Sequence, residues 1–438
     1  MTSIANKLSR IVGAAFEAQD LPTEMGLVRV SDRPDLAQFQ CNGAMAAAKQ
    51  ARKNPREVAQ AVVDVLSSNE IFSKVEIAGP GFINLNITTH YLQDHLTEIA
   101  KDERFGVPVL GEGKIILDYG GMNVAKAMHV GHLRPNVIGD CLRNILRFAG
   151  YDALGDVHLG DWGLQMGQII SEFEIRNPEW PYFDENYKGN YPPEPPFTYA
   201  ELEKIYPEAS QACKDDKERL EKARKATAKL QDGHTGYTAL WQHFIDLSLI
   251  DIRNNLAPLK IEYDIWNGEA CVHPLINEIS KDLEKRNISE ISEGATIIKV
   301  AEEEDKKEIP PLMFFKSDGA VTYGTTDMAT IYDRVKKYPD LKKMIYVVDY
   351  RQSLHFEQVF RASKKAGYTK DIEMLHIGNG TVNGADGKPF KTREGKAMTF
   401  RNLVGTVIDK AMDRLNEADL AQDMRDEARL EIARKVGV

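Results

Sequence analysis

The stretch from 114 to 167 constrains the fold of this 438-residue chain more than any other. A short apolar strand pattern ends at Asp118, a loop rich in Gly and Asn follows, and the tetrapeptide HVGH then opens a predicted helix. A helix N-terminus offers unpaired N–H groups and a positive dipole end to phosphates. Its histidines, His129 and His132, lie on one helix face and can both reach a triphosphate, while Gly131 lets a base or ribose approach the backbone. This order predicts a nucleotide site in which two imidazoles stabilise charge on phosphorus.

Further along the chain, strands and helices alternate. Strand patterns at 343–348 and 373–377 are followed by Asp349 and by Gly378, and the run YGTTD leads a helix that carries Arg334. Strands that alternate with helices in this way predict an α/β fold with a doubly wound, Rossmann-like parallel sheet. Ligands in such sheets bind at the carboxyl ends of the strands, which is where these motifs fall.

Composition limits the class of protein. No run of eighteen apolar residues exists, which predicts no membrane span, and the net charge of −10 argues against indiscriminate binding of nucleic acid. The four cysteines are scattered without a CxxC pair, so the sequence suggests neither a zinc site, nor another metal site, nor a disulfide framework. Reduced thiols in the cytoplasm are the expectation, and we expect a monomer.

The remaining segments indicate several domains. Residues 1–105 read as a small α+β domain, and a Gly/Pro linker at 106–113 leads into a catalytic domain that extends to about 400. Two insertions are expected in that domain, a helical one around 176–235 and a mixed α/β one around 264–322. A capping box of Thr198 and Glu201 predicts a helix start in the first insertion. The smaller elements are predicted as helices at 3–18, 43–51, 55–68 and 236–263, strands at 74–78, 82–87 and 295–300, and a hairpin at 317–319.

The tetrapeptide HVGH resembles the HIGH motif of class I aminoacyl-tRNA synthetases. With NVAKAMHVGHLR around it and HLGDWGLQMG after it, the sequence is similar to arginyl-tRNA synthetases. The resemblance implies ATP-dependent activation of L-arginine to arginyl-adenylate, followed by transfer to the 3′ adenosine of tRNA(Arg), with Mg²⁺ accompanying ATP. It also implies a set of residues that contact ATP: His129, Gly131, His132, Gly160, Asp161 and Gln165.

The resemblance further implies an arginine pocket. In a YxTTD motif of this family the Tyr and the Asp bind the guanidinium, which assigns Tyr323 and Asp327, and a carboxylate is the partner that a planar cationic fork requires. Asp118, Asn123 and Gln352 match residues that hold the polar ends of the amino acid. For Asp327 the alternative is an N-cap of the following helix, a role for which Thr326 competes.

Near the C-terminus, GKPFKTREG resembles the second class I motif, KMSKS, with Thr392 where its second lysine should stand. The resemblance implies that Lys126, just before HVGH, compensates. A cation must meet the leaving pyrophosphate, and Lys126, Lys388 and Lys391 all remain candidates for that catalytic role. The loop before Lys126 also carries Gly120 and Gly121, and extra glycine should loosen it.

Residues 1–105 resemble the N-terminal additional domain of the family, which contacts the tRNA elbow. This assigns phosphate contacts to Lys49, Arg52, Lys53 and Arg56, with a solvated helix face as the alternative. Residues 401–438 read as the helical start of an anticodon-binding region that the sequence does not continue, either by truncation or by natural loss. Two rival functions stay open: a paralogue that uses arginyl-adenylate or arginyl-tRNA outside translation, and a non-catalytic tRNA-binding module.

Overall fold

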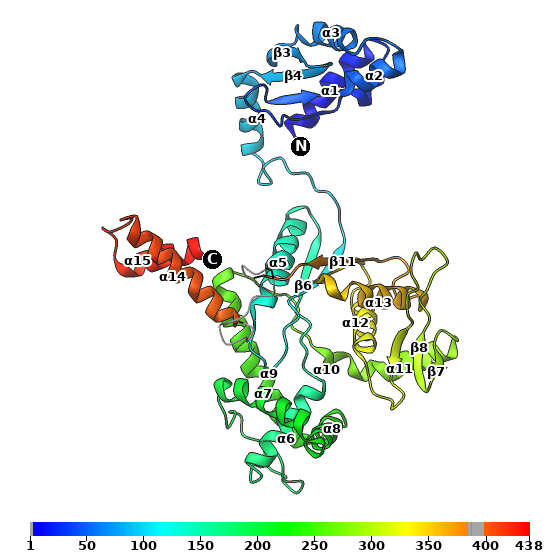
Figure 1. Cartoon of the computed structure of the whole chain (residues 1–438), viewed down its shortest axis with the longest axis vertical. Coiled ribbons are helices and arrows are strands. Elements are labelled where there is room, and N and C mark those ends of the chain that lie inside the picture. The colour runs from blue at the N-terminus through cyan, green and yellow to red at the C-terminus, as the bar shows by residue number, and fades with distance from the viewer. Residues whose placement is uncertain (1–2, 384–386, 388–397) are drawn as a thin grey trace. The chain divides into compact units, whose positions relative to one another are not determined.

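A computed structural model of the chain describes residues 3–383, 387 and 398–438. It divides into two compact units, one of Met1–Gly111 with Phe148–Gly150 and the other of Glu112–Arg147 with Tyr151–Val438. Figure 1 shows the elements of each unit. None of the described helices is both long and apolar enough to cross a membrane.

The N-terminal unit is a four-stranded antiparallel sheet packed against helices. The strands lie in the order β1 (Val28–Val30), β2 (Phe39–Cys41), β4 (Phe82–Ile87), β3 (Phe72–Ala78). The helices are α1 (Ile4–Glu17), α2 (Gly43–Ala51), α3 (Pro55–Leu66) and α4 (Thr89–Ala100). Asn54 caps α3 by accepting a hydrogen bond from the Arg56 amide at 2.9 Å, with Pro55 in the first turn. The expected helices and the last two strands are present, whereas α4 was not anticipated. Strands β1 and β2 were also not anticipated, because strands of three residues leave little periodic signal.

The second unit is built on a parallel sheet in the order β11 (Glu373–Asn379), β10 (Leu341–Asp349), β5 (Lys114–Tyr119), β6 (Asp152–Asp156). Successive residues of a strand point to opposite faces. Ile115 and Leu117 belong to one buried cluster and Ile116 to another, so both faces of β5 are covered. This confirms the predicted doubly wound α/β sheet.

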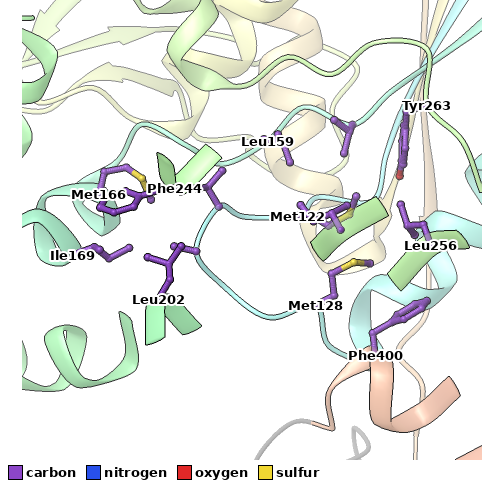
Figure 2. Close-up of a cluster of buried hydrophobic side chains, with 14 of the residues drawn as sticks. Met122, Met128, Leu159, Met166, Ile169, Leu202, Phe244, Leu256, Tyr263 and Phe400 are labelled. Atoms are coloured by element: carbon purple, nitrogen blue, oxygen red, sulfur yellow. The ribbon is translucent and has the colours of Figure 1, made fainter. Parts of the chain in front are cut away.

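One cluster packs beneath the helices that follow β5 and β6. These are α5 (Leu133–Phe148), α6 (Leu164–Arg176), α7 (Tyr199–Asp215), α8 (Lys217–Gln231) and α9 (Thr235–Leu256). Figure 2 shows part of it, including Met122 and Met128 of the loop after β5 and Phe400 of α14 (Phe400–Glu417). The Thr198 capping box is confirmed at the start of α7. The helix expected over 236–263 ends earlier, at Leu256, because a short 3₁₀ turn containing Pro258 follows.

The other cluster packs on the opposite face, among α11 (Ile276–Lys285), α12 (Tyr323–Lys337) and α13 (Ser353–Lys365). Before α12 the chain forms the short helix α10 (Glu269–Val272) and an antiparallel sheet of β7 (Glu290–Ser292), β8 (Ala295–Ile298) and β9 (Leu312–Phe315). The expected hairpin turn at 317–319 is present, but its second arm is a single bridge between Phe315 and Val321. The described chain ends with α14 and α15 (Asp426–Gly437).

Candidate active site

The HVGH segment forms a compact turn in which each histidine binds backbone. His129 is the N-cap of a 3₁₀ turn, Val130–His132, and α5 starts only at Leu133. Nδ1 of His129 accepts the Gly131 amide at 3.1 Å, and Nδ1 of His132 accepts the His129 amide at 3.0 Å. The two rings stack with centroids 4.0 Å apart. Because each Nδ1 is an acceptor, the proton of each neutral ring lies on Nε2, so both rings are donors at that atom.

Both imidazoles are held in the neutral form. Burial, followed by the nearby charges of His129 and Lys126, lowers the pKa of His132 to about 3. Burial and then the Lys126 charge also lower the pKa of His129. The positive charge of Lys126 thus contributes to both shifts. Gly131 is exposed, and a Cβ there would lie 2.9 Å from the His129 ring, so this glycine leaves room for the imidazole.

The loop between β5 and HVGH is tied to the loop after β6. The Val124 amide donates to the Gly160 carbonyl and the Gly160 amide to the Met122 carbonyl, both at 3.0 Å. A Cβ at Gly160 would lie 2.2 Å from Oδ1 of Asn123, so glycine permits this close approach. These two backbone hydrogen bonds therefore fix the loop, although Gly120 and Gly121 were expected to loosen it.

The chain segments before and after GKPFKTREG (387–395) both form hydrogen bonds with residues in or next to HVGH. Arg134 donates to the Thr381 carbonyl at 3.3 Å. The Val130 amide donates to the Met398 carbonyl at 3.0 Å, and the Phe400 amide donates to the Met128 carbonyl at 2.8 Å. Lys388 and Lys391 lie outside the described residues. Segments that precede and follow the motif are therefore anchored beside the two histidines.

A buried ion cluster lies at the carboxyl ends of β5 and β6. Asp118 and Asp156 are register partners at those ends, and Arg334 of α12 donates to both, at 2.6 and 2.7 Å. Arg334 also donates to the Tyr346 hydroxyl at 3.0 Å. Burial raises the pKa of the Asp118 carboxyl. Two carboxylates around one guanidinium leave an excess of negative charge, which a cationic ligand group can balance.

A second acidic cluster involves Glu269 of α10 and Asp327 in the first turns of α12. Burial raises the pKa of Glu269 to about 7, with further contributions from the charges of Asp161 and Asp327. Asp327 Oδ2 pairs with Nε2 of His355 on α13, while the Tyr323 side chain is 77% exposed. The capping alternative for Asp327 is wrong, because Thr322 caps α12 and binds the Thr325 amide at 3.3 Å. Two neighbouring, half-buried carboxyl groups suit a guanidinium.

Comparisons with known proteins agree over the whole chain. A family model described as "tRNA synthetases class I (R), catalytic domain" matches residues 95–438, and one described as "Arginyl tRNA synthetase N terminal domain" matches residues 2–87. An arginine–tRNA ligase of Alkaliphilus oremlandii is 46% identical over 440 residues, which cover 100% of this chain and 74% of the relative. An arginine–tRNA ligase of Hyphomonas neptunium is 47% identical over 440 residues, which cover 100% of this chain and 75% of that relative.

The chain belongs to the arginyl-tRNA synthetases.

It is an arginine–tRNA ligase with a class I catalytic domain. Neither the paralogue nor the non-catalytic module is named in these matches. The fold is also that of solved arginyl-tRNA synthetases. The Plasmodium falciparum structure matches with a TM-score of 0.73 at 21% identity, covering 100% of this chain and 73% of that one. The Thermus thermophilus structure matches with a TM-score of 0.69 at 19% identity, covering 99% and 74%.

In this synthetase, some of the residues predicted to bind the substrates form hydrogen bonds with other parts of the protein. Gln165, at the start of α6, donates from Nε2 to the Val124 carbonyl. Asp161 accepts the Ala270 amide at 2.9 Å, and burial raises the pKa of Asp161 to about 6. It therefore supports α10, which carries Glu269. Gln352 is exposed in the turn after β10.

Sequence reasoning missed Glu269, His355 and the link from Arg334 to Asp118. Glu269 lies in NGEACV, where no motif marks it, and its partners come from elements that start far away in the sequence. The expected tRNA contacts lie in the N-terminal unit of the synthetase. Lys49, Arg52, Lys53 and Arg56 are all exposed around the α2–α3 junction.

Proposed function

We propose that the carboxyl edge of the parallel sheet performs both steps of arginylation. A carboxylate oxygen of arginine attacks the α-phosphorus of ATP, and pyrophosphate leaves with the electron pair of the broken P–O bond. His129 and His132 donate from Nε2 to the charge that develops, and Lys126 meets the pyrophosphate. The terminal hydroxyl of tRNA(Arg) then attacks the activated carbonyl, and AMP leaves. The observation that supports this best is the pair of stacked imidazoles whose Nδ1 atoms both accept backbone amides, which leaves each Nε2 available to donate.

Arginine recognition follows from the two acidic clusters. Asp327 and Glu269 hold the guanidinium, and Tyr323 closes over it. At the other end, Asp118 and its excess negative charge attract the α-ammonium group, with Asn123 and Gln352 as hydrogen-bonding partners. Glu269 extends the set that the resemblance implies, because a buried carboxyl with a pKa near neutrality gains charge when a cation binds beside it.

ATP binding uses Gly131, Gly160, Asp161 and Gln165 around HVGH, and Lys388 and Lys391 remain candidates for the pyrophosphate. Among the residues that the structure describes, no three His, Cys, Asp or Glu side chains gather as a potential metal site. Mg²⁺ fits as an ion that arrives on the phosphate oxygens of ATP, where it would neutralise phosphate charge. We further propose a cytoplasmic location, which the four unpaired cysteine thiols support, and a monomeric state.

Arginine binding should weaken as the pH falls through about 7. In the free protein Glu269 has a pKa of about 7, and a guanidinium beside it favours the ionised form. Well above pH 7 this carboxylate is charged and binding is complete, whereas below pH 7 a proton competes with arginine. We expect about tenfold weaker binding at pH 6 than at pH 8, measured by calorimetry, with net proton release near pH 7.

Glu269→Gln is the matched variant for this pH dependence. It should bind arginine weakly at pH 8 and lose most of the change between pH 6 and 8. Asp161, Asp327 and Tyr323 lie close to Glu269, His355 pairs with Asp327, and all four remain intact in this variant. An equal pH dependence in the variant and the parent would assign the titration to one of those groups instead.

The basic cluster of the N-terminal unit should bind phosphates of the tRNA. Arg56 already donates to the Gly79 carbonyl at 3.1 Å, so Lys49 and Lys53 are the cleaner positions to change. In Lys49→Ala/Lys53→Ala the slope of log affinity against log salt should become shallower by about 2, near 0.9 for each phosphate that is no longer neutralised. Binding of tRNA(Arg) across a salt series measures it.

Lys74→Ala is the matched control in the same unit, because Lys74 is exposed but already paired with Glu76 at 2.7 Å. It should leave the salt slope within error of the parent. A double variant with an unaltered slope would show that the cluster is a solvated helix face.

A further inference from the structure

The carboxylate of Asp327 is held by a side chain from the neighbouring helix. Nε2 of His355, in the first turn of α13, lies 2.5 Å from Oδ2 of Asp327, in the second turn of α12. Because an ionised carboxylate only accepts hydrogen bonds, we assign the shared proton to Nε2, and the imidazole is the donor. No second group donates to this carboxylate in the part of the chain that the structure describes, so Oδ1 is available to a ligand.

The backbone that carries this pair is anchored on both helices. Met328 follows Asp327 and Phe356 follows His355, and these two neighbours are buried in the same apolar cluster. The side chains of Asp327 and His355 themselves remain 23% and 30% exposed. The pair therefore lies where the apolar cluster meets solvent, with each partner presented from a fixed stretch of helix.

This packing fixes the backbone but not the plane of the carboxylate. The χ2 torsion of an aspartate is broad and two-fold, so rotamer preference alone defines that plane loosely. A guanidinium is a rigid planar fork and binds a carboxylate best when the two planes match. A hydrogen bond to Oδ2 restricts χ2 before arginine arrives, which reduces the ordering that binding would otherwise have to impose.

We propose that His355 is a positioning residue for arginine recognition: by donating to Oδ2 of Asp327, it turns the carboxylate so that Oδ1 meets the guanidinium. This inference rests on the proposed role of Asp327. It gives a function to a histidine that no motif marked. Gln352, proposed for the polar end of arginine, directly precedes α13, so one turn of chain would serve both ends of the substrate.

Two substitutions of His355 separate the donor from the ring. His355→Phe keeps a ring beside Phe356, whose ring centroid lies 5.2 Å from that of the imidazole, but it cannot donate. Adenylate formation is measured with tRNA(Arg) present, with separate kcat and KM values for arginine and ATP. KM for arginine should rise about tenfold or more, the scale of one lost hydrogen bond to a charged group. Both kcat and KM for ATP should stay within about twofold of the parent.

His355→Gln is the conservative variant, because its amide nitrogen reaches about where Nε2 lies. It should keep KM for arginine within about threefold of the parent, since a donor to Oδ2 is still present. A merely structural role of the imidazole ring predicts the opposite ranking, with the phenylalanine variant closer to the parent than the glutamine variant.

A double-mutant cycle shows whether His355 acts through Asp327. In the Asp327→Asn background there is no charged carboxylate left to position. Adding His355→Phe should therefore lower kcat/KM for arginine by less than about threefold beyond Asp327→Asn alone. The matched control on α13 is Glu357→Gln, which removes the ion pair of Glu357 with Arg361 at 2.6 Å and should leave KM for arginine unchanged.

The outcomes are distinguishable. If Asp327→Asn weakens arginine and citrulline equally, the proposed role of Asp327 fails and this inference fails with it. If Asp327→Asn weakens arginine more but His355→Phe keeps the parent KM, or if the two defects multiply, only the positioning role is overturned. Tighter arginine binding in His355→Phe would also overturn it, because the imidazole would then compete with arginine for the carboxylate. Should His355→Phe not fold, His355→Asn, whose side chain is too short to reach Asp327, enters the same cycle.

Discussion

Replacing His129 by asparagine should lower the rate of adenylate formation about 10²–10³-fold, the effect of losing one preorganised donor in a transition state. The asparagine oxygen can still accept the Gly131 amide as Nδ1 does at 3.1 Å, so the turn should persist. What is lost is the donor at the position of Nε2. Single-turnover formation of arginyl-adenylate, with tRNA(Arg) present, measures the rate.

His129→Gln is the complementary variant. Its amide nitrogen reaches about where Nε2 lies, whereas it loses the acceptor that Nδ1 provides. We expect it to retain more activity than the asparagine variant, because the donor and not the capping contact serves the reaction. The opposite ranking, with unchanged circular dichroism in both variants, would assign His129 a purely structural role.

Replacing Asp327 by asparagine should weaken arginine binding by about 2–5 kcal/mol, the range for removing one partner of a desolvated charge pair. The amide has nearly the shape of the carboxylate, so His355 keeps a neighbour at the same place. The ureido group of citrulline is neutral, so loss of the carboxylate leaves no unpaired charge on this ligand. Its binding should therefore change much less. Equilibrium binding of both ligands to the parent and the variant gives the comparison.

Asp333→Asn is the control on the same helix. Asp333 pairs with Lys337 at 2.8 Å, outside the pocket of Asp327 and Glu269, and its loss should leave arginine affinity nearly unchanged. Equal losses for arginine and citrulline in Asp327→Asn would mean that Asp327 shapes the pocket without meeting the guanidinium.

Much of the fold was predictable because the relevant signals are local. The run that ends at Asp118, the Thr198 capping box and the Asn54-Pro55 helix start each depend on neighbours within four residues, and each is present. The predictions were weaker where an element depends on distant chain. The short strands β1 and β2 are set by pairing that no local pattern reports.

The site divides in a similar way. HVGH and the YGTTD run supplied His129, His132 and Asp327 from the sequence, but the 3₁₀ turn that makes each histidine a donor at Nε2 is a property of the folded backbone. Glu269 carried no motif. It became a candidate only because α10 brings it close to Asp161 and Asp327, where burial and their charges raise its pKa.

The sequence by itself indicated the family and, through that resemblance, the reaction, because the motifs that carry the resemblance are residue types at short, fixed spacings. Only the tertiary structure decided which charges meet. Arg334 on α12 donates to both Asp118 and Asp156 on adjacent strands, and Ser248 accepts a hydrogen bond from the Ala125 amide from a helix that starts more than a hundred residues later. Burial and hydrogen bonding depend on which distant segments pack together, and that pairing is set by the core of the whole unit.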